Sequence, residues 1–344
     1  MKIRLWTVAL ALVFLTAILS SCNSKSAAAE GVKLQGAGAS FPAPLYNKWF
    51  KGYSASHQDL QVDYQSVGSG SGKKSVIDHT VDFGASDAAM TDEEMARVPG
   101  GVQLLPMTAG AIVIAYNVDG VPNLNLSRKA YSGIFLGKIK RWNDPAIVAA
   151  NPGVKLPDLP INVVVRADSS GTSFVFSKHL SAISEDFNKA VGANTMPNWP
   201  VGTKSKGNEG VTASLKTTPG AIGYVEFGYA NSQKLTTATL ENKAGKYVAA
   251  STASGQAALA SAELPSNLIV WASDPASADA YPIVTYTWII CYRHYPDAKK
   301  LAALQDLLKY GLTDGQKDSE ALGYIPLPAT TVSKAVAAVQ TITN

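Results

Sequence analysis

One short segment combines a permanent positive charge with several hydrogen-bond donors. Residues 166–172 read Arg-Ala-Asp-Ser-Ser-Gly-Thr and stand between two apolar runs, which predicts a strand, a polar turn and the start of a helix. Backbone N–H groups converge at such a helix start, where the helix dipole adds positive potential. Together with the Arg166 guanidinium and the hydroxyls of Ser170 and Thr172, they suit a tetrahedral oxyanion. The alternative is an ordinary helix cap beside a surface arginine.

Two further turns have the same character. Residues 36–44 (GAGASFPAP) follow a short strand-like stretch, and Pro42 suits the first turn of a helix, which puts Ser40 near its cap. Residues 68–74 (GSGSGKK) separate a strand-like from a helix-like stretch, and their glycines let the backbone approach an anion closely. This is not a Walker A loop, because Val67 stands where its first glycine is needed. Taken alone, each turn is also typical of a simple cap or a flexible connection.

A carboxylate accompanies these donors. Asp87 follows a short strand-like stretch, so we expect it at the end of a strand, facing the same point as the turns. A negative group aimed at an anion makes sense only if the ligand has a proton to donate to it. The alternative is that Asp87 caps the helix expected from about Thr91. A second acid, Asp168, is expected to hold the Arg166 guanidinium in place.

Strand and helix signals alternate along the chain, and these elements must position the turns. The runs that predict strands are 111–116, 161–165, 222–225, 268–271 and 283–292. Helices are predicted at 42–54, 173–182 and 298–310, the last stopped by Gly311, and loops are predicted at 192–210 and 241–256. The alternation favours α/β layers with largely parallel sheets.

The composition indicates a large folded protein with few charges. The chain has 344 residues, of which 46% are hydrophobic and 16% charged, which suffices for a large core and predicts two domains. Its formal charge of +4 falls to +2, with 28 basic and 26 acidic residues, once Lys2 and Arg4 are removed with the leader. There is no basic block, so we expect no nucleic-acid partner.

The N-terminus has the pattern of a secretion signal. Lys2 and Arg4 precede an apolar run at 5–19, and Leu19-Ser20-Ser21-Cys22 resembles the bacterial lipobox. We therefore expect a lipoprotein signal peptide at 1–21, a lipid anchor on Cys22 and a tether at 22–30. The alternative is a plain signal peptide with a chance cysteine. With Cys22 acylated, Cys291 has no partner for a disulfide within the chain, and we expect it to be a buried, inert thiol.

Eight longer motifs lie between about residue 31 and residue 337. They are GAGASFPAPLY, YQSVGSGSG, VDFGASDAAM, VVVRADSSGTSFVF, IFLGKIKRWNDPAI, NPGVKLP, KGNEGV and PGAIGYVEFGYA. Through these motifs the chain resembles the phosphate-binding protein of the bacterial high-affinity phosphate ABC transporter. Ser40 departs from a common threonine but keeps the hydroxyl, and Gly70-Ser71 reverses a pair. The segment 236–273 matches poorly.

The resemblance implies a type II periplasmic-binding-protein fold. This is a two-lobed α/β architecture of mixed sheets flanked by helices, with the ligand in the cleft between the lobes. One lobe would take 31–115 plus 286–344 and the other 116–285. The phosphate contacts it implies are Ala39, Ser40, Phe41, Ser69, Asp87, Arg166, Ser170, Gly171 and Thr172, with Asp168 as the acidic partner of the arginine.

The function implied is capture of inorganic phosphate outside the cytoplasm and its delivery to the permease subunits of an ABC transporter. We expect a monomer in the periplasm or on the cell surface, with no cofactor, no metal and no enzymatic activity. One alternative is a binding protein for another tetrahedral oxyanion, such as sulfate or arsenate. Another is a secreted phosphatase, but the four histidines are scattered and none adjoins the anion-facing turns.

Overall fold

The computed structural model describes residues 31–344. The expected signal peptide, Cys22 and the tether lie outside the described residues, so the structure does not test them. Among residues 31–344, no helix has the length and apolar character needed to cross a membrane.

A mixed sheet forms the centre of the described part of the chain. It has nine strands in the order β2-β1-β3-β12-β4-β8-β6-β7, with β9 paired to β4, and a smaller sheet has the order β11-β10-β5. The strands are β1 (Val32–Gly38), β2 (Leu60–Ser66), β3 (Phe83–Ser86), β4 (Val102–Asn117), β5 (Asn125–Leu126), β6 (Asn162–Arg166), β7 (Thr203–Ser205), β8 (Ala221–Glu226), β9 (Thr236–Thr237), β10 (Thr239–Glu241), β11 (Tyr247–Val248) and β12 (Val284–Tyr292).

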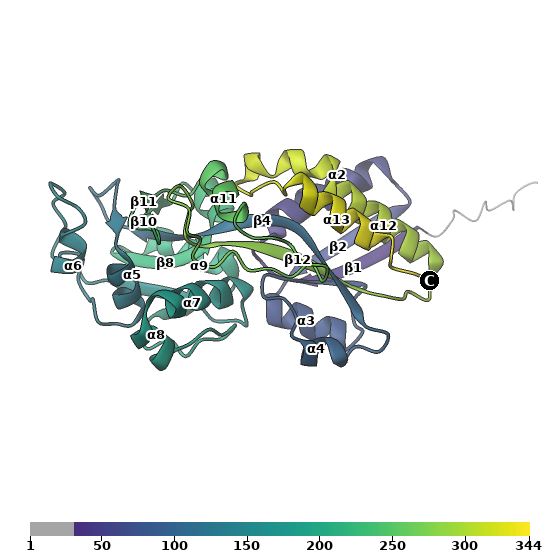
Figure 1. Ribbon diagram of the computed structural model, residues 1–344, viewed down its shortest axis with the longest axis horizontal. Helices are drawn as coiled ribbons and strands as arrows, with labels where there is room; N and C mark the ends of the chain where they lie inside the picture. The colour runs from purple at the N-terminus through teal and green to yellow at the C-terminus, as the bar shows by residue number, and fades with distance from the viewer. Residues whose placement is uncertain (1–30) are drawn as a thin grey trace, which may run out of the picture.

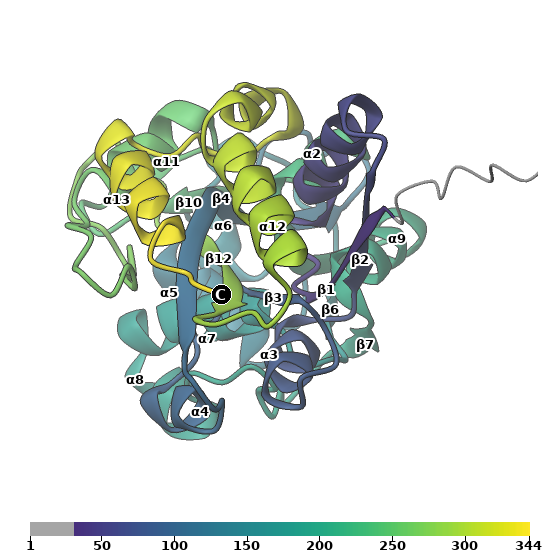
Figure 2. The same ribbon diagram turned by 90° about the vertical axis from the view of Figure 1, so that its right-hand side faces the viewer.

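Helices cover both faces of this sheet. Figure 1 shows α2, α12 and α13 above the strands and α3, α4, α7 and α8 below them, and Figure 2 shows the same layers end on. The helices are α2 (Ala43–Ser56), α3 (Ser69–Ile77), α4 (Asp92–Ala96), α5 (Arg128–Phe135), α6 (Pro145–Val148), α7 (Gly171–Ile183), α8 (Glu185–Ala190), α9 (Gly207–Thr217), α10 (Phe227–Ser232), α11 (Thr252–Leu259), α12 (Ala298–Leu312) and α13 (Ala329–Val339), with short 3₁₀ turns η1 (Asp314–Asp318) and η2 (Glu320–Leu322).

Two parallel groups of strands are joined by two long antiparallel strands. β1 pairs in parallel with β2 and β3, and β6 pairs in parallel with β7 and β8. β4 pairs with β12 through Val102–Ala111 and with β8 through Ile112–Asn117, so one strand belongs to both groups. The molecule is correspondingly elongated along the sheet (Figure 1). The predicted α/β class is confirmed.

Local patterns explain the elements next to the site. In α2, Leu45, Tyr46, Trp49 and Phe50 are buried at helical spacing, so one face of the helix packs on the core. Every residue of β12 is buried, because the strand lies between β3 and β4. That burial includes Cys291, as expected, and burial raises the pKa of its thiol to about 12.

Most predicted elements are present, but four details were wrong. The run 268–271 has no regular secondary structure, and Leu268 has a φ of 59°. Its Trp271 instead packs on aromatic rings of α7 and β12. Gly311 lies inside α12, which ends one residue later. The predicted loops 192–210 and 241–256 contain β7 with the start of α9, and β11 with the start of α11.

Candidate anion-binding site

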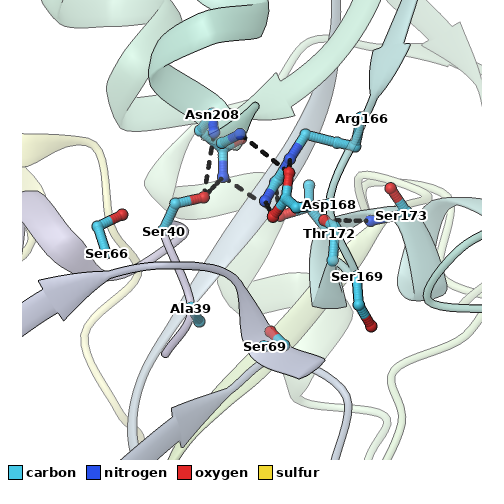
Figure 3. Close-up of polar contacts among 12 residues, drawn as sticks. Ala39, Ser40, Ser66, Ser69, Arg166, Asp168, Ser169, Thr172, Ser173 and Asn208 are labelled. Atoms are coloured by element: carbon cyan, nitrogen blue, oxygen red, sulfur yellow. Dashed lines mark hydrogen bonds and ion pairs between the residues drawn. The ribbon is translucent and has the colours of Figure 1, made fainter. Parts of the chain in front are cut away.

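The segments picked out in the sequence follow the carboxyl ends of parallel strands. The loop at Ala39 follows β1, Ser69 comes shortly after β2, Asp87 follows β3, and Arg166 is the last residue of β6. In open α/β sheets this edge is the usual place for a ligand. The side chains from the two strand groups meet there, as Figure 3 shows for most of them. All nine predicted contact residues are buried.

The loop after β1 has its carbonyl groups occupied and two N–H groups free. Tyrosine hydroxyls donate to three consecutive carbonyl oxygens: Tyr64 to Ala39 (2.7 Å), Tyr229 to Ser40 (2.6 Å) and Tyr324 to Phe41 (2.7 Å). The N–H of Ala39 donates to Ala85 (2.9 Å). Within residues 31–344 the N–H groups of Ser40 and Phe41 have no acceptor, which leaves them available to an anion.

The loop after β2 leads directly into α3. Gly68 precedes the helix with a φ of 94°, a conformation that favours glycine, and Ser69 is the first helical residue. The N–H of Ser69 has no intrahelical partner at this position, while its Oγ accepts from the N–H of Asp87 (3.2 Å). Gly70 donates to the carbonyl of Ser169 (3.0 Å), so this loop also contacts the other strand group.

Arg166 is held by Asp168 in a two-point ion pair. Its Nε donates to Oδ1 (2.9 Å) and its Nη2 to Oδ2 (2.5 Å) of that carboxylate, which also accepts from the N–H of Gly207 (3.0 Å). Burial tends to raise the pKa of Asp168, but the hydrogen bonds and charge of Arg166 outweigh it and hold the pKa below its ordinary value. The Arg166 side chain is 1% exposed, and its Nη1 reaches Thr172 Oγ1 (3.4 Å). The guanidinium is therefore fixed in the site and always charged.

The start of α7 adds further donors. Ser170 caps the helix, because its Oγ accepts from the N–H of Ser173 (3.0 Å). The alternative of an ordinary helix cap is therefore correct for this residue, and Arg166 is buried, not a surface arginine. The hydroxyl proton of Ser170 stays free to donate. The N–H groups of Gly171 and Thr172 lie in the first turn and have no intrahelical acceptor. A Cβ atom on Gly171 would lie 2.5 Å from Ser69 Oγ, so the two strand groups meet at this point.

Asp87 lies within this set of donors. The residue is 1% exposed, and its Oδ1 accepts from Thr287 Oγ1 (2.8 Å). Burial raises its pKa to about 7, although the Thr287 hydrogen bond and the nearby charge of Arg166 act in the opposite direction. The alternative role as a helix cap is wrong, because Thr91 caps α4 with its own side chain. A hollow lined by residues of both strand groups, among them Gln65 and Ser169, borders the site.

Comparison with known proteins identifies the chain. A model of the PBP superfamily domain matches residues 23–314. The phosphate-binding protein PstS of Xylella fastidiosa (strain 9a5c) is 38% identical over 311 residues, which cover 89% of this chain and 84% of the relative. PstS of Methanocaldococcus jannaschii is 37% identical over 317 residues, covering 85% and 81%. The chain belongs to the PstS family of phosphate-binding proteins.

Solved structures confirm the fold expected of a PstS family member. A high-affinity periplasmic phosphate-binding protein (PfluDING) bound with phosphate has a TM-score of 0.70 at 20% identity, covering 89% of this chain and 93% of that one. A phosphate-binding protein from Stenotrophomonas maltophilia gives 0.68 at 20% identity, covering 89% and 94%. At this level of identity the likeness concerns the fold, which is the two-lobed α/β type that the motifs implied.

Two residues of the candidate site were not predicted from the sequence. Asn208, at the start of α9, contacts both Ser40 and Thr172, and Thr287 in β12 contacts Asp87. Asn208 was detectable, because Gly207-Asn208 lies in KGNEGV and follows a strand as the other anion-facing turns do. Thr287 lies in an apolar run far from the other motifs, and nothing in its local sequence indicates its partner.

Proposed function

We propose that this chain captures inorganic phosphate outside the cytoplasm and delivers it to the permease of an ABC transporter. The observation that carries the proposal is one buried carboxylate, Asp87, in a site otherwise built from hydrogen-bond donors. The names of the PstS relatives support phosphate as the ligand. Those relatives are named as binding proteins, which agrees with a function that involves no catalysis.

The proposed contacts satisfy an anion by hydrogen bonding. Donors to the phosphate oxygens are the Arg166 guanidinium, free backbone N–H groups at the two helix starts and in the loop after β1, and serine and threonine hydroxyls. The nine proposed contacts are Ala39, Ser40, Phe41, Ser69, Asp87, Arg166, Ser170, Gly171 and Thr172. Among them Ala39 offers van der Waals contact only, because its N–H donates to Ala85 and its carbonyl accepts from Tyr64. Aligned N–H groups and helix dipoles supply the attraction locally, so a strongly positive protein is not required.

Asp87 gives the site its selectivity in this proposal. Phosphate near neutral pH always carries a proton that the Asp87 carboxylate accepts, whereas sulfate carries none. A site built around a required hydrogen bond rejects a ligand that lacks it by roughly 10⁴-fold. The unpaired buried carboxylate adds a cost of about 3–5 kcal/mol when sulfate enters. Discrimination therefore comes from repulsion as much as from attraction.

The lobes of the proposed binding protein are 31–115 plus 286–344 and 116–285. Pairing of β4 with β12 on one side and with β8 on the other supports a division along these strands. Direct contacts between the lobes support closure over the ligand, such as Ser66 Oγ donating to Glu209 Oε1 (3.0 Å). A ligand that touches both lobes favours the closed arrangement through its additional contacts.

The proposed location is the periplasm or the cell surface, with a lipid on Cys22 as the membrane anchor. The basis is the leader and the sequence Leu19-Ser20-Ser21-Cys22. Cys22→Ala should move the protein from the membrane fraction to the soluble fraction of fractionated cells. A variant that stays with the membranes would refute lipidation at this residue.

Calorimetric titration of the purified protein tests the ligand. Protein stripped of bound phosphate by unfolding and refolding is titrated with phosphate, arsenate and sulfate. Tight binding of phosphate with no detectable binding of sulfate supports the proposal. Absence of a phosphate signal would overturn it, and tighter binding of arsenate or sulfate would transfer the function to that oxyanion. Release of phosphate from a phosphate ester would indicate the phosphatase alternative.

A further inference from the structure

Asn208 is a fully buried amide that connects both sides of the site. Its backbone N–H and its Nδ2 donate to Ser40 Oγ, at 3.1 and 2.9 Å, and its Nδ2 also reaches Thr172 Oγ1 at 3.3 Å. Ser40 follows β1 and Thr172 lies in α7, so one side chain contacts hydroxyls from both lobes (Figure 3).

The orientation of the Asn208 amide is determined by its partners. Its Oδ1 accepts from the N–H of Glu226 (2.9 Å), and a backbone N–H can only donate. The oxygen must therefore face Glu226, and the NH₂ group must face Ser40 and Thr172. Glu226 ends β8 at its pairing with β4, so the amide is anchored on the sheet.

This orientation restricts what the two hydroxyls can do. A hydroxyl oxygen has two acceptor positions and one proton. On Ser40 both acceptor positions are filled, one by the backbone N–H and one by the Nδ2 of Asn208. The Ser40 hydroxyl can therefore only donate its proton to a further partner. Thr172 Oγ1 likewise faces two donors, Asn208 Nδ2 and Arg166 Nη1 (3.4 Å). Both hydroxyls are therefore fixed as donors.

We propose that Asn208 is a positioning residue that makes Ser40 and Thr172 obligate hydrogen-bond donors and so determines where the bound phosphate carries its proton. This inference rests on the proposed function. A hydroxyl that can only donate cannot accept the proton of a P–OH group. The P–OH group is then directed to the one acceptor in the set, Asp87.

A double-mutant cycle tests the inference. Asn208→Ala should weaken phosphate binding by about tenfold to a hundredfold, because the hydroxyls are no longer held as donors to the anion. In the Ser40→Ala background, Asn208→Ala should weaken phosphate binding by at most about threefold, because the Ser40 hydroxyl that Asn208 holds is already absent. The control is Asn242→Ala, because Asn242 is also fully buried and its Nδ2 donates to backbone carbonyls of 277–280, away from the site.

A second variant covers the case in which Asn208→Ala does not fold. Asn208→Asp has nearly the same shape, keeps an acceptor for Glu226 and loses the side-chain donor to Ser40, while the backbone N–H of residue 208 still donates to Ser40 Oγ. Its phosphate affinity should fall at pH 8. The part of the loss that depends on Ser40 should disappear in the Ser40→Ala background, and the part due to repulsion between the new carboxylate and the anion should remain. Equal losses with and without Ser40, or a loss no larger than in Asn242→Ala, would overturn the inference. If wild-type protein itself fails to bind phosphate, the proposed function fails instead.

Discussion

Replacing Asp87 by asparagine should stabilise the phosphate-free protein, and only at higher pH. The carboxyl is buried, and burial raises its pKa from 3.8 to about 7. Below about pH 4 the carboxyl is neutral in both the folded and the unfolded protein, so it does not lower the free energy of unfolding. As the pH rises through 7, that free energy falls, because the unfolded chain ionises this carboxyl more easily than the folded protein does. At one pH unit per 1.36 kcal/mol, the buried charge destabilises the folded protein by about 4 kcal/mol at pH 8.

Asp87→Asn removes this charge and keeps an oxygen that can accept from Thr287. Its unfolding free energy should equal that of the wild type near pH 4 and exceed it by about 4 kcal/mol at pH 8. Urea unfolding of phosphate-free protein at several pH values measures the difference, and titration of groups that Asp87 does not influence cancels in the comparison. Glu226 is the exception, because its pKa is raised by burial and also by the charge of Asp87. The control is Asp63→Asn, at an exposed position of β2. A difference for Asp87→Asn that does not change with pH would refute the reasoning.

Two further changes test the geometry of the site through phosphate affinity measured by calorimetry. Arg166→Ala should cost about 1.5–3 kcal/mol, because a charge-assisted hydrogen bond is lost, and unchanged affinity would exclude this residue from the ligand shell. Gly171→Ala should abolish tight binding, because the new Cβ would lie 2.5 Å from Ser69 Oγ and 2.7 Å from Asp87 Oδ2 where the lobes meet. The control is Gly210→Ala in α9, where the nearest atom is 3.6 Å away; equal behaviour of the two variants would contradict the tight contact.

The local part of the site was predictable from the sequence. Each turn combines a strand, small polar residues and a helix start, and this order alone places N–H groups and hydroxyls at one edge of a parallel sheet. Asp87 was recognisable because it follows a strand beside such turns, although the sequence left open that it caps the helix that begins after Thr91, and the structure gives that role to Thr91 itself. The helix cap that the sequence left open as an alternative is present at Ser170, and the same residue also lies in the site.

Contacts between distant segments were not predictable in the same way. Thr287 meets Asp87 because β12 pairs with β3, a pairing that depends on the whole sheet. The strand predicted at 268–271 fails for a related reason. Its apolar residues suit a strand, but the segment is held by distant side chains. Trp271 packs on Phe174 and Trp288, and the carbonyl of Leu268 accepts from Trp288 Nε1 (2.8 Å).

The most direct test compares sulfate and phosphate dissociation constants for the wild type and Asp87→Asn, by competition calorimetry at pH 8. Asparagine offers an N–H₂ group where the carboxylate oxygen stood, so sulfate no longer meets an unpaired negative charge. The wild-type ratio should be roughly 10⁴ or more, and the variant's ratio should fall by at least about a hundredfold. An equal ratio in the two proteins would show that Asp87 does not distinguish a protonated oxyanion from an unprotonated one.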